Sequence, residues 1–245
     1  MNQDANPWNV LATKNFNTQI KQGEIDPESA DNILLAWPSI VDGITQTFPQ
    51  IKGLSALDYG CGTGAFCAHL EQMGFTVTGI DPAAEMIRIA KDNTPQTIHY
   101  ITGDHANMPA EKKFDVITSI MTFPFIKDIN GVFSALTSAL YENGIFVFAV
   151  FNPAWVTESL KDDVWFADFN SIDHPKNGWK TFGNMRMPVY IRNAAEYDDL
   201  ALRNGLVKIM EDNPLFTQAF LGKYPDYVPN NVSEYLILGY KKQHQ

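Results

Sequence analysis

The first residues that could do chemistry form a glycine-rich turn within residues 56–66, which read Ala-Leu-Asp-Tyr-Gly-Cys-Gly-Thr-Gly-Ala-Phe. Gly60, Gly62 and Gly64 permit positive φ angles and let a ligand approach the backbone, because no Cβ stands in the way. The helix expected to follow offers unpaired N–H groups. Asp58 adds a negative charge just before the turn. A site with this carboxylate suits a ligand that carries a cation better than one that carries a bare pyrophosphate.

The same turn also fits, loosely, the fingerprint of nicotinamide- or flavin-binding enzymes, with Ala65 in the last glycine position. Three acids separate the two interpretations. Asp58 precedes the glycines, Asp81 follows a strand-like run, and Asp104 follows a third apolar run. A dinucleotide site uses an acid at the place of Asp81 to bind ribose, but it has no need of the other two.

The motif D-x-G-x-G-x-G, taken together with Asp81 and Asp104, resembles class I S-adenosylmethionine (SAM)-dependent methyltransferases, whose pattern uses all three acids. The likeness extends in outline to residues 8–12, 151–153 and 190–200, although only the cofactor motifs are specific. It implies SAM as the cofactor and a small molecule as the substrate. It also implies an α/β fold with a Rossmann-like, seven-stranded, mostly parallel sheet and helices on both faces.

The resemblance assigns roles around the turn. Tyr59, Gly60, Cys61 and Gly62 would lie against the methionine part of SAM, and the Gly60 carbonyl would accept a hydrogen bond from its ammonium group. Asp81 would accept from both ribose hydroxyls, a charge-assisted pair that fixes the sugar.

The adenine end of the cofactor would lie further along the same edge. Pro82 and Met86 would flank the ring, Asp104 would accept from the adenine amine, and the backbone N–H of His105 would meet a ring nitrogen. Asp58 and Ser119 complete the predicted cofactor-binding set. Helix capping and turn formation are alternative roles for Asp81 and Asp104, because aspartate often fills them.

SAM carries its own electrophilic methyl group, so the protein would mainly hold a nucleophile in line and exclude water. A base is needed only when the nucleophile arrives protonated. Many small-molecule members of the family place histidines after the fourth strand, where this chain has Thr-Phe-Pro-Phe at residues 122–125. We therefore expect a methyl transfer to an N or O atom of a small, partly apolar molecule, mainly by positioning.

No catalytic residue is assigned on this basis. His174 and Tyr190 are candidates, as are the acids Asp168 and Asp173, and each could also be an ordinary loop residue. Two other functions remain open. One is a SAM-binding module without turnover, and the other is an NAD-dependent oxidoreductase.

The composition narrows the range of partners. The chain has 245 residues, 45% of them hydrophobic, and a formal net charge of -10. This charge argues against nucleic acid, whose binding depends on Lys and Arg. Residues 1–7 lack the pattern of a signal peptide, and nothing approaches the ~20-residue apolar span of a membrane helix. The two cysteines lack the spacing of a zinc site, so we expect reduced thiols and no metal. We expect a cytoplasmic protein. The sequence does not determine its oligomeric state.

Strand-like and helix-like segments alternate through the middle of the chain, which predicts a parallel sheet. Strands are expected at residues 54–58, 75–80, 97–101, 114–120 and 145–151. Helices are expected after the glycines, after Asp81 and around Phe133, the last ending at Asn143-Gly144. A closing helix at 194–204 and strands at 206–210 and 234–240 complete the pattern.

We expect one methyltransferase-like domain with four parts: a helical cap segment (1–50), a cofactor-binding core (51–151), a lid or substrate insertion (152–192) and the closing helix and strands (193–245). All five tryptophans fall in the cap segment and the insertion. Long insertions in compact domains are often binding segments, so this enrichment favours an aromatic-lined pocket over the strand ends.

Overall fold

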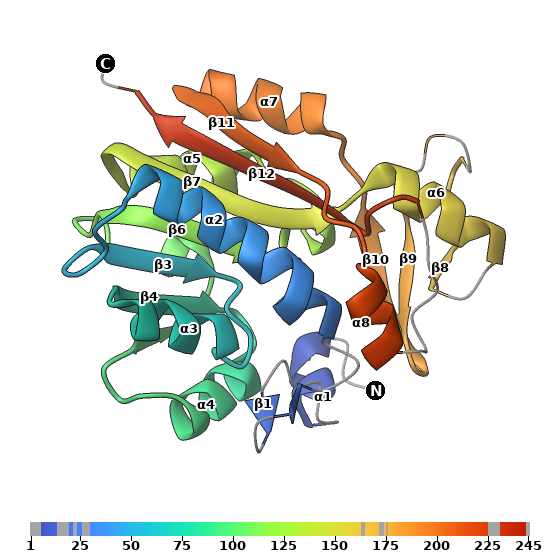
Figure 1. Ribbon diagram of the computed structural model, residues 1–245, viewed down its shortest axis with the longest axis horizontal. Coiled ribbons are helices and arrows are strands. Elements are labelled where there is room, and N and C mark those ends of the chain that lie inside the picture. Colours follow the sequence, from blue (N-terminus) through green and yellow to red (C-terminus); the bar gives the residue numbers. More distant parts are fainter. Residues whose placement is uncertain are drawn as a thin grey trace.

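A seven-stranded sheet forms the centre of the molecule (Figure 1). The computed structural model describes residues 6–13, 20–21, 24–25, 30–162, 165–171, 174, 176–224 and 231–243. The strand order is β11-β12-β7-β6-β3-β4-β5, and β12 runs antiparallel to both of its neighbours. The strands are β3 (Ser55–Tyr59), β4 (Thr76–Asp81), β5 (His99–Thr102), β6 (Phe114–Ile120), β7 (Leu140–Phe151), β11 (Leu206–Asp212) and β12 (Tyr235–Lys242). The predicted fold class is confirmed.

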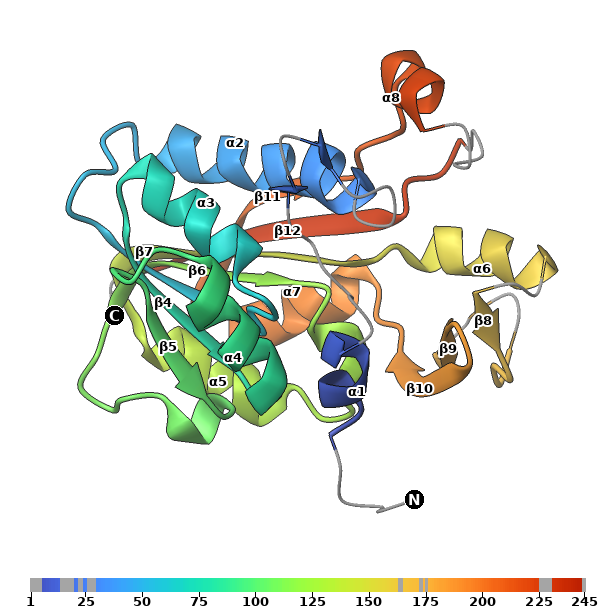
Figure 2. The same ribbon diagram turned by 90° about the horizontal axis from the view of Figure 1, so that it is seen from below.

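Helices cover both faces of the sheet (Figure 2). One face carries α2 (Trp37–Thr47), α3 (Ala65–Met73) and α4 (Ala84–Asn93), and the opposite face carries α5 (Asn130–Ser138) and α7 (Ala194–Arg203). Alternate residues of β7 pack into the two layers, Val147 with the first and Phe148 with the second. Burial on both faces explains why this strand is apolar at nearly every position from Ile145 onward.

The chain order within the sheet creates a switch point. From β3 the chain continues to β4 on one side, and it later returns to place β6 on the other side of β3. Crossovers therefore diverge beyond the carboxyl ends of β3 and β6, which is where open α/β sheets bind ligands. The glycine-rich turn follows β3 at this point.

Residues 152–192, expected to be an insertion, form a helix and a small sheet at one end of the molecule (Figure 1). The elements are α6 (Pro153–Asp162), β8 (Phe166–Ala167), β9 (Asn177–Phe182) and β10 (Met185–Tyr190). The three strands are antiparallel in the order β10-β9-β8. A further helix, α8 (Gln218–Lys223), lies between β11 and β12, and the sequence patterns gave no indication of it.

Two expectations about element boundaries were wrong. The helix around Phe133 ends at Ser138 rather than at Asn143-Gly144, and β7 already begins at Leu140. The pairing of β6 with β7 jumps from Phe114–Leu140 to Val116–Ile145, so the strand bulges there. Asn143, with φ 65°, uses its left-handed conformation to form this bulge instead of ending a helix.

The N-terminal cap segment is not helical throughout. It contains α1 (Pro7–Thr13) and a π-helical segment (Asn32–Ala36) that leads into α2. Between them, β1 (Ile20–Lys21) pairs antiparallel with β2 (Glu24–Ile25), which corrects the expectation of helix alone. No helix within the described ranges has both the length and the hydropathy needed to cross a bilayer.

Candidate functional site

The glycine-rich turn has the backbone shape that its glycines allow. Gly60, Gly62 and Gly64 have φ angles of 77°, 52° and 79°. A Cβ on Gly60 would lie 2.0 Å from Thr122 Oγ1, so a side chain at this position would prevent the turn from lying against the end of β6. A Cβ on Gly62 would meet nothing within 4 Å. The turn therefore offers bare backbone to open space at Gly62, as a closely approaching ligand requires.

Asp81 connects the turn to the next helix. It is 9% exposed at the end of β4, its Oδ2 accepts from the Gly62 N–H at 3.0 Å, and its Oδ1 accepts from the Ala83 N–H at 2.8 Å. Burial raises the pKa of this carboxyl, and the two N–H bonds oppose the rise. Each carboxylate oxygen keeps a second lone pair, so this turn-forming role leaves room for ribose.

Asp58 lies beneath the turn. It is 3% exposed, its Oδ1 accepts from Thr118 Oγ1 at 2.9 Å, and its Oδ2 accepts from Cys67 Sγ at 3.5 Å. Burial raises the pKa of Asp58 to about 6, and the Thr118 bond opposes the rise. A bound cation would thus interact with Asp58 through the turn rather than by direct contact. Cys61 and Cys67 are buried free thiols, and burial raises the pKa of each.

Asp104 and His105 form a second edge of the site. The Asp104 carboxylate is exposed and accepts from the Ala106 N–H at 2.8 Å, so it caps the short turn His105–Asn107. Burial, and next the Asp104 charge, raise the pKa of Tyr59 to about 12, while the backbone N–H of His105 bonds the Tyr59 hydroxyl. An adenine nitrogen would share that N–H with Tyr59.

Ser119 supports the turn from below. Its buried hydroxyl donates to the Tyr59 carbonyl at 2.9 Å, which ties β6 to the end of β3. The residue predicted as part of the cofactor set is therefore brought to the turn, where it fixes the backbone.

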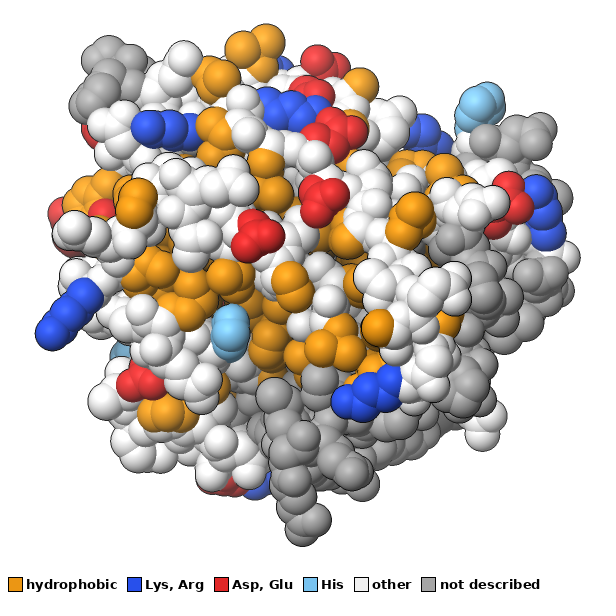
Figure 3. Space-filling model, in the orientation of Figure 1, with side chains coloured by type: hydrophobic (Ala, Val, Ile, Leu, Met, Phe, Trp, Pro, Cys, Tyr) orange, Lys and Arg blue, Asp and Glu red, His pale blue; other side chains and the backbone are white. Residues whose placement is uncertain are grey.

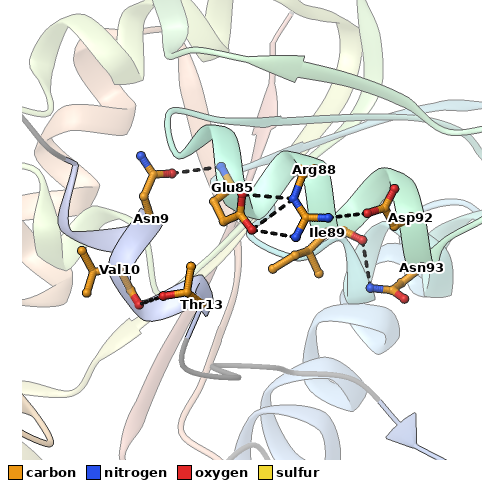
Figure 4. Close-up of polar contacts among 8 residues, drawn as sticks. All are labelled: Asn9, Val10, Thr13, Glu85, Arg88, Ile89, Asp92 and Asn93. Atoms are coloured by element: carbon orange, nitrogen blue, oxygen red, sulfur yellow. Dashed lines mark hydrogen bonds and ion pairs between the residues drawn. The ribbon is translucent and has the colours of Figure 1, made fainter.

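The N-terminal helix α1 packs on the start of α4. Asn9 Oδ1 accepts from the Glu85 N–H at 2.9 Å (Figure 4). The N-cap position of α4 is Ala83, which has no side-chain cap, so Asn9 satisfies a helix N–H from another segment. Met86 is buried with Leu11, Ala12, Ala83 and Met187, whereas Pro82 is exposed. The cap segment thus covers Met86, one of the two residues predicted to flank adenine, and leaves Pro82 exposed.

The structure describes three of the four predicted catalytic candidates, all of them in the insertion. His174 is exposed and lines a hollow of about 160 Å³ whose other lining residues are Pro153, Ala154, Thr157, Lys176, Ile191 and Asn193. Tyr190 is on the opposite face of β10 from Met187, because successive strand residues alternate. Asp168 pairs with Arg186 at 2.6 Å. Asp173 lies outside the described residues, and the role of any of these four residues as a base stays a prediction.

Aromatic rings of the cap segment and the insertion pack together, and the predicted pocket over the strand ends stays a prediction. Trp8 lies with its ring 5.0 Å from that of Phe125 and 5.7 Å from that of Phe182. Trp155 packs against Phe151 and Phe166. Three charged residues near these rings were missed from the sequence: Lys180, Glu234 and Asp31. Of these three, only Lys180 could have been found from the sequence, because strand alternation puts it on the same face as Phe182.

A metal site finds no support in the part of the chain that is described. Within those ranges, no three His, Cys, Asp or Glu side chains are grouped so that they could hold an ion.

Comparisons with known proteins match the part of the chain that holds this site. A family model described as a methyltransferase domain matches residues 31–203. An uncharacterized methyltransferase of Alkaliphilus oremlandii is 38% identical over 113 residues, which are 45% of this chain and 50% of that relative. A ubiquinone biosynthesis O-methyltransferase of Rhodopseudomonas palustris is 29% identical over 113 residues, 45% of either chain. The chain thus spans about half the length of the curated relatives it matches.

A solved structure with the same fold covers nearly the whole chain. The SAM-dependent methyltransferase of Mesorhizobium loti superposes with a TM-score of 0.65 at 19% identity, covering 87% of this chain and 98% of that one. At this identity the likeness concerns the fold.

Proposed function

The chain belongs to the methyltransferase domain family, and on that premise we propose that it transfers a methyl group from SAM to an N or O atom of a small, partly apolar molecule. The name of the Mesorhizobium loti neighbour supports SAM as the methyl donor. The name of the Rhodopseudomonas palustris relative supports a small acceptor and favours oxygen as the receiving atom.

One observation carries the proposal. The bare backbone of Gly62 lies directly beside Asp81, at the point where the crossovers of the sheet diverge. A flat or extended ligand can approach the turn there while a carboxylate binds its hydroxyls. The exposed Asp104 and the exposed, apolar Pro82 extend the same edge, which fits the polar and apolar parts of an adenosyl group.

The residues of the chain would mainly bind and orient. When bound, SAM supplies the sulfonium methyl group. Gly60 and Gly62 hold its amino-acid end, Asp81 orients the ribose, and Asp104 accepts from the adenine amine. The helix α1 and the insertion exclude water from this edge. Because the segment after β6 reads Thr-Phe-Pro-Phe, the proposal rests on positioning rather than on a base at that place.

The proposed partner is a small molecule and not a nucleic acid. Figure 3 shows one face of the molecule, on which the coloured Lys and Arg side chains are scattered rather than gathered in a band. A net charge of -10 acts in the same direction. We place the protein in the cytoplasm, where a reducing environment suits the buried free thiols Cys61 and Cys67.

Ligand-induced stabilisation tests the cofactor. Thermal unfolding is measured with SAM, with S-adenosylhomocysteine and with NAD⁺, because a ligand that binds only the native state stabilises it, by about 2.7 kcal/mol at a hundred times its Kd. We expect both sulfur ligands to raise the Tm and NAD⁺ to have no effect. Asp81→Ala should abolish the shift, whereas Asp92→Ala, an exposed ion-pair residue on α4, should keep it.

Two results would decide against the proposal. Stabilisation by NAD⁺ alone would indicate an oxidoreductase. Binding of SAM without any methyl gain in a mass-detected screen of small phenols, amines and carboxylic acids would indicate a SAM-binding module.

A further inference from the structure

A lysine is buried among aromatic rings on the inner face of the insertion. The Lys180 side chain on β9 is 8% exposed. Its Nζ lies 4.4 Å from the ring centroid of Trp165, 4.9 Å from that of Phe166 and 5.6 Å from that of Phe182. It donates no hydrogen bond to any residue in the described ranges. A desolvated ammonium group with unused donors is costly, so an acceptor at this position would be bound strongly.

Two carboxyl groups lie within electrostatic range of this ammonium. Glu234 directly precedes β12, and its side chain is hydrogen-bonded to that of Asp31. Tyr235 Oη donates to Asp31 Oδ2 at 2.6 Å. Burial, and next the charge of Asp31, raise the pKa of Glu234 well above its usual value. The hydrogen bond between Glu234 and Asp31 holds these two carboxyl groups together beside the ammonium group.

The charge of Lys180 itself survives at neutral pH. Burial lowers the pKa of Lys180 to about 8, and Glu234 and Asp31 oppose the fall. We call Lys180, Glu234, Asp31 and Tyr235 the Lys180 cluster. Tyr235 already donates to Asp31, so within the described residues the donors left over are those of Lys180. An ammonium group with such donors suits an oxygen anion.

The cluster adjoins the proposed cofactor edge. In the insertion sheet Lys180 pairs with Met187 on one side and with Phe166 on the other, so all three point to the same face. Met187 packs with Met86 and Ala83 beside Asp81. The Phe125 ring bridges the two regions, with its centroid 5.9 Å from that of Phe182 and 6.3 Å from that of Phe151.

One of the rings around Lys180 lies partly at the surface. Trp165, the ring nearest to Lys180, is 53% exposed. A flat molecule could therefore lie between the rings with its anionic end at Lys180 and its other end toward Phe125 and the turn.

We propose that Lys180 binds the carboxylate of the methyl acceptor, and that the acceptor is an aromatic or otherwise flat, apolar carboxylic acid. This inference rests on the proposed function and makes Lys180 a positioning residue. The opposite reading, an amine held by Glu234 and Asp31, is an outcome of the test below.

Three probes of equal size and different charge test the inference: benzoate, benzamide and benzylamine. Their affinities are measured by calorimetry at pH 7 with the full chain saturated with S-adenosylhomocysteine. We expect benzoate to bind most tightly. Lys180→Met, which keeps an unbranched apolar side chain but removes the ammonium group, should weaken benzoate binding by about tenfold or more, in line with the loss of one charge-assisted hydrogen bond. It should leave benzamide unchanged.

Control variants separate the charge of Lys180 from general effects. Lys161→Met removes an exposed lysine on α6 that pairs with Glu158, and it should bind benzoate like the wild type. Glu234→Gln keeps a neutral donor and should also retain benzoate. In the wild type, benzoate affinity should fall between pH 7 and pH 9 as Lys180 loses its proton beside Glu234, Asp31 and Tyr235, whereas benzamide affinity should not. This pH series needs no variant, so it holds even if Lys180→Met does not fold.

Several results would overturn the inference. These are equal benzoate affinity in Lys180→Met and wild type, no binding of any probe at millimolar concentration, or tightest binding of benzylamine with loss in Glu234→Gln. The last would make the cluster an amine site. Binding of S-adenosylhomocysteine is measured in every variant. If the wild type does not bind it, the proposed function fails, whereas intact binding with a Lys180-independent probe refutes only the inference.

Discussion

Asp58 is ionisable and almost fully enclosed, and this makes it a reporter of folding. Its pKa in the folded chain is about 6, against 3.8 as the usual value, so the folded state binds more protons in this range. The stabilisation that its protonated form provides is present at low pH and is lost as the pH rises through 6. Between pH 4 and pH 7, Asp58→Asn should gain about 2–3 kcal/mol of unfolding free energy relative to the wild type. Urea titrations at each pH measure this.

The control for Asp58 is a surface acid. Asp92→Asn, at an exposed ion pair with Arg88, should follow the wild-type pH profile. If the Asp58→Asn and wild-type profiles ran parallel, the burial of a charged Asp58 would have no energetic consequence.

Gly62 and Gly183 form a matched pair for testing the turn. Their φ angles are 52° and 57°, and a Cβ on either would meet nothing within 4 Å. Alanine at each should cost about 1–2 kcal/mol of stability, because both need the left-handed conformation. Only Gly62→Ala should also weaken S-adenosylhomocysteine by about tenfold or more, which corresponds to about 1.4 kcal/mol. Calorimetry on both variants decides, and equal affinities would mean that the ligand does not approach Gly62.

At this scale the sequence predicted one half of the site better than the other. The glycines, Asp58, Asp81 and Asp104 are close in the chain, and their spacing alone placed them at one edge. Lys180, Glu234 and Asp31 are far apart in sequence and share no pattern, so only the folded chain brings them together. The choice of His174 and Tyr190 stays a prediction, and it treated the insertion as a loop, without a sheet whose strands have two faces.

At the scale of elements, the contact between α1 and α4 lies beside the proposed cofactor edge. Asn9 caps a helix that has no side-chain cap of its own (Figure 4). Asn9→Ala should remove about 1 kcal/mol of stabilisation from this contact. S-adenosylhomocysteine should therefore dissociate several times faster, as stopped-flow fluorescence can measure.

The control for Asn9 lies on α4, the helix whose N–H group Asn9 binds. Asn93 donates to the Ile89 carbonyl near the other end of α4 (Figure 4). Asn93→Ala should leave the dissociation rate unchanged. An equal effect of both variants would assign the change to α4 as a whole rather than to the packing of α1.

Most elements were predictable, and the exceptions have physical causes. The strand at 114–120 was placed at its observed bounds, because a run rich in β-formers follows the polar turn at 111–113. The end of α5 was misplaced because Asn143-Gly144 fits a helix end and a bulge equally well. The hairpin of β1 and β2 is two residues per strand, too short to produce a periodic pattern.

At the scale of the molecule, ligand binding should tighten one region and leave another alone. S-adenosylhomocysteine should slow amide exchange in α1 and the first turn of α4, because the cap segment packs over that edge. The edge strand β11 lies at the far side of the sheet and serves as the internal control. Exchange measured by mass spectrometry checks this, and equal slowing in β11 would argue for global rather than local stabilisation.

The residues proposed around the cofactor all fall between positions 58 and 119, while the Lys180 cluster draws on positions 31, 180 and 234. The two proposed halves of the site thus come from separate parts of the sequence. Substitutions in β9 and its neighbours could change the small molecule that is bound, while the turn proposed to bind the nucleoside stays the same. In the same way, replacing the insertion between β7 and α7 by that of another protein could change which small molecule the chain binds.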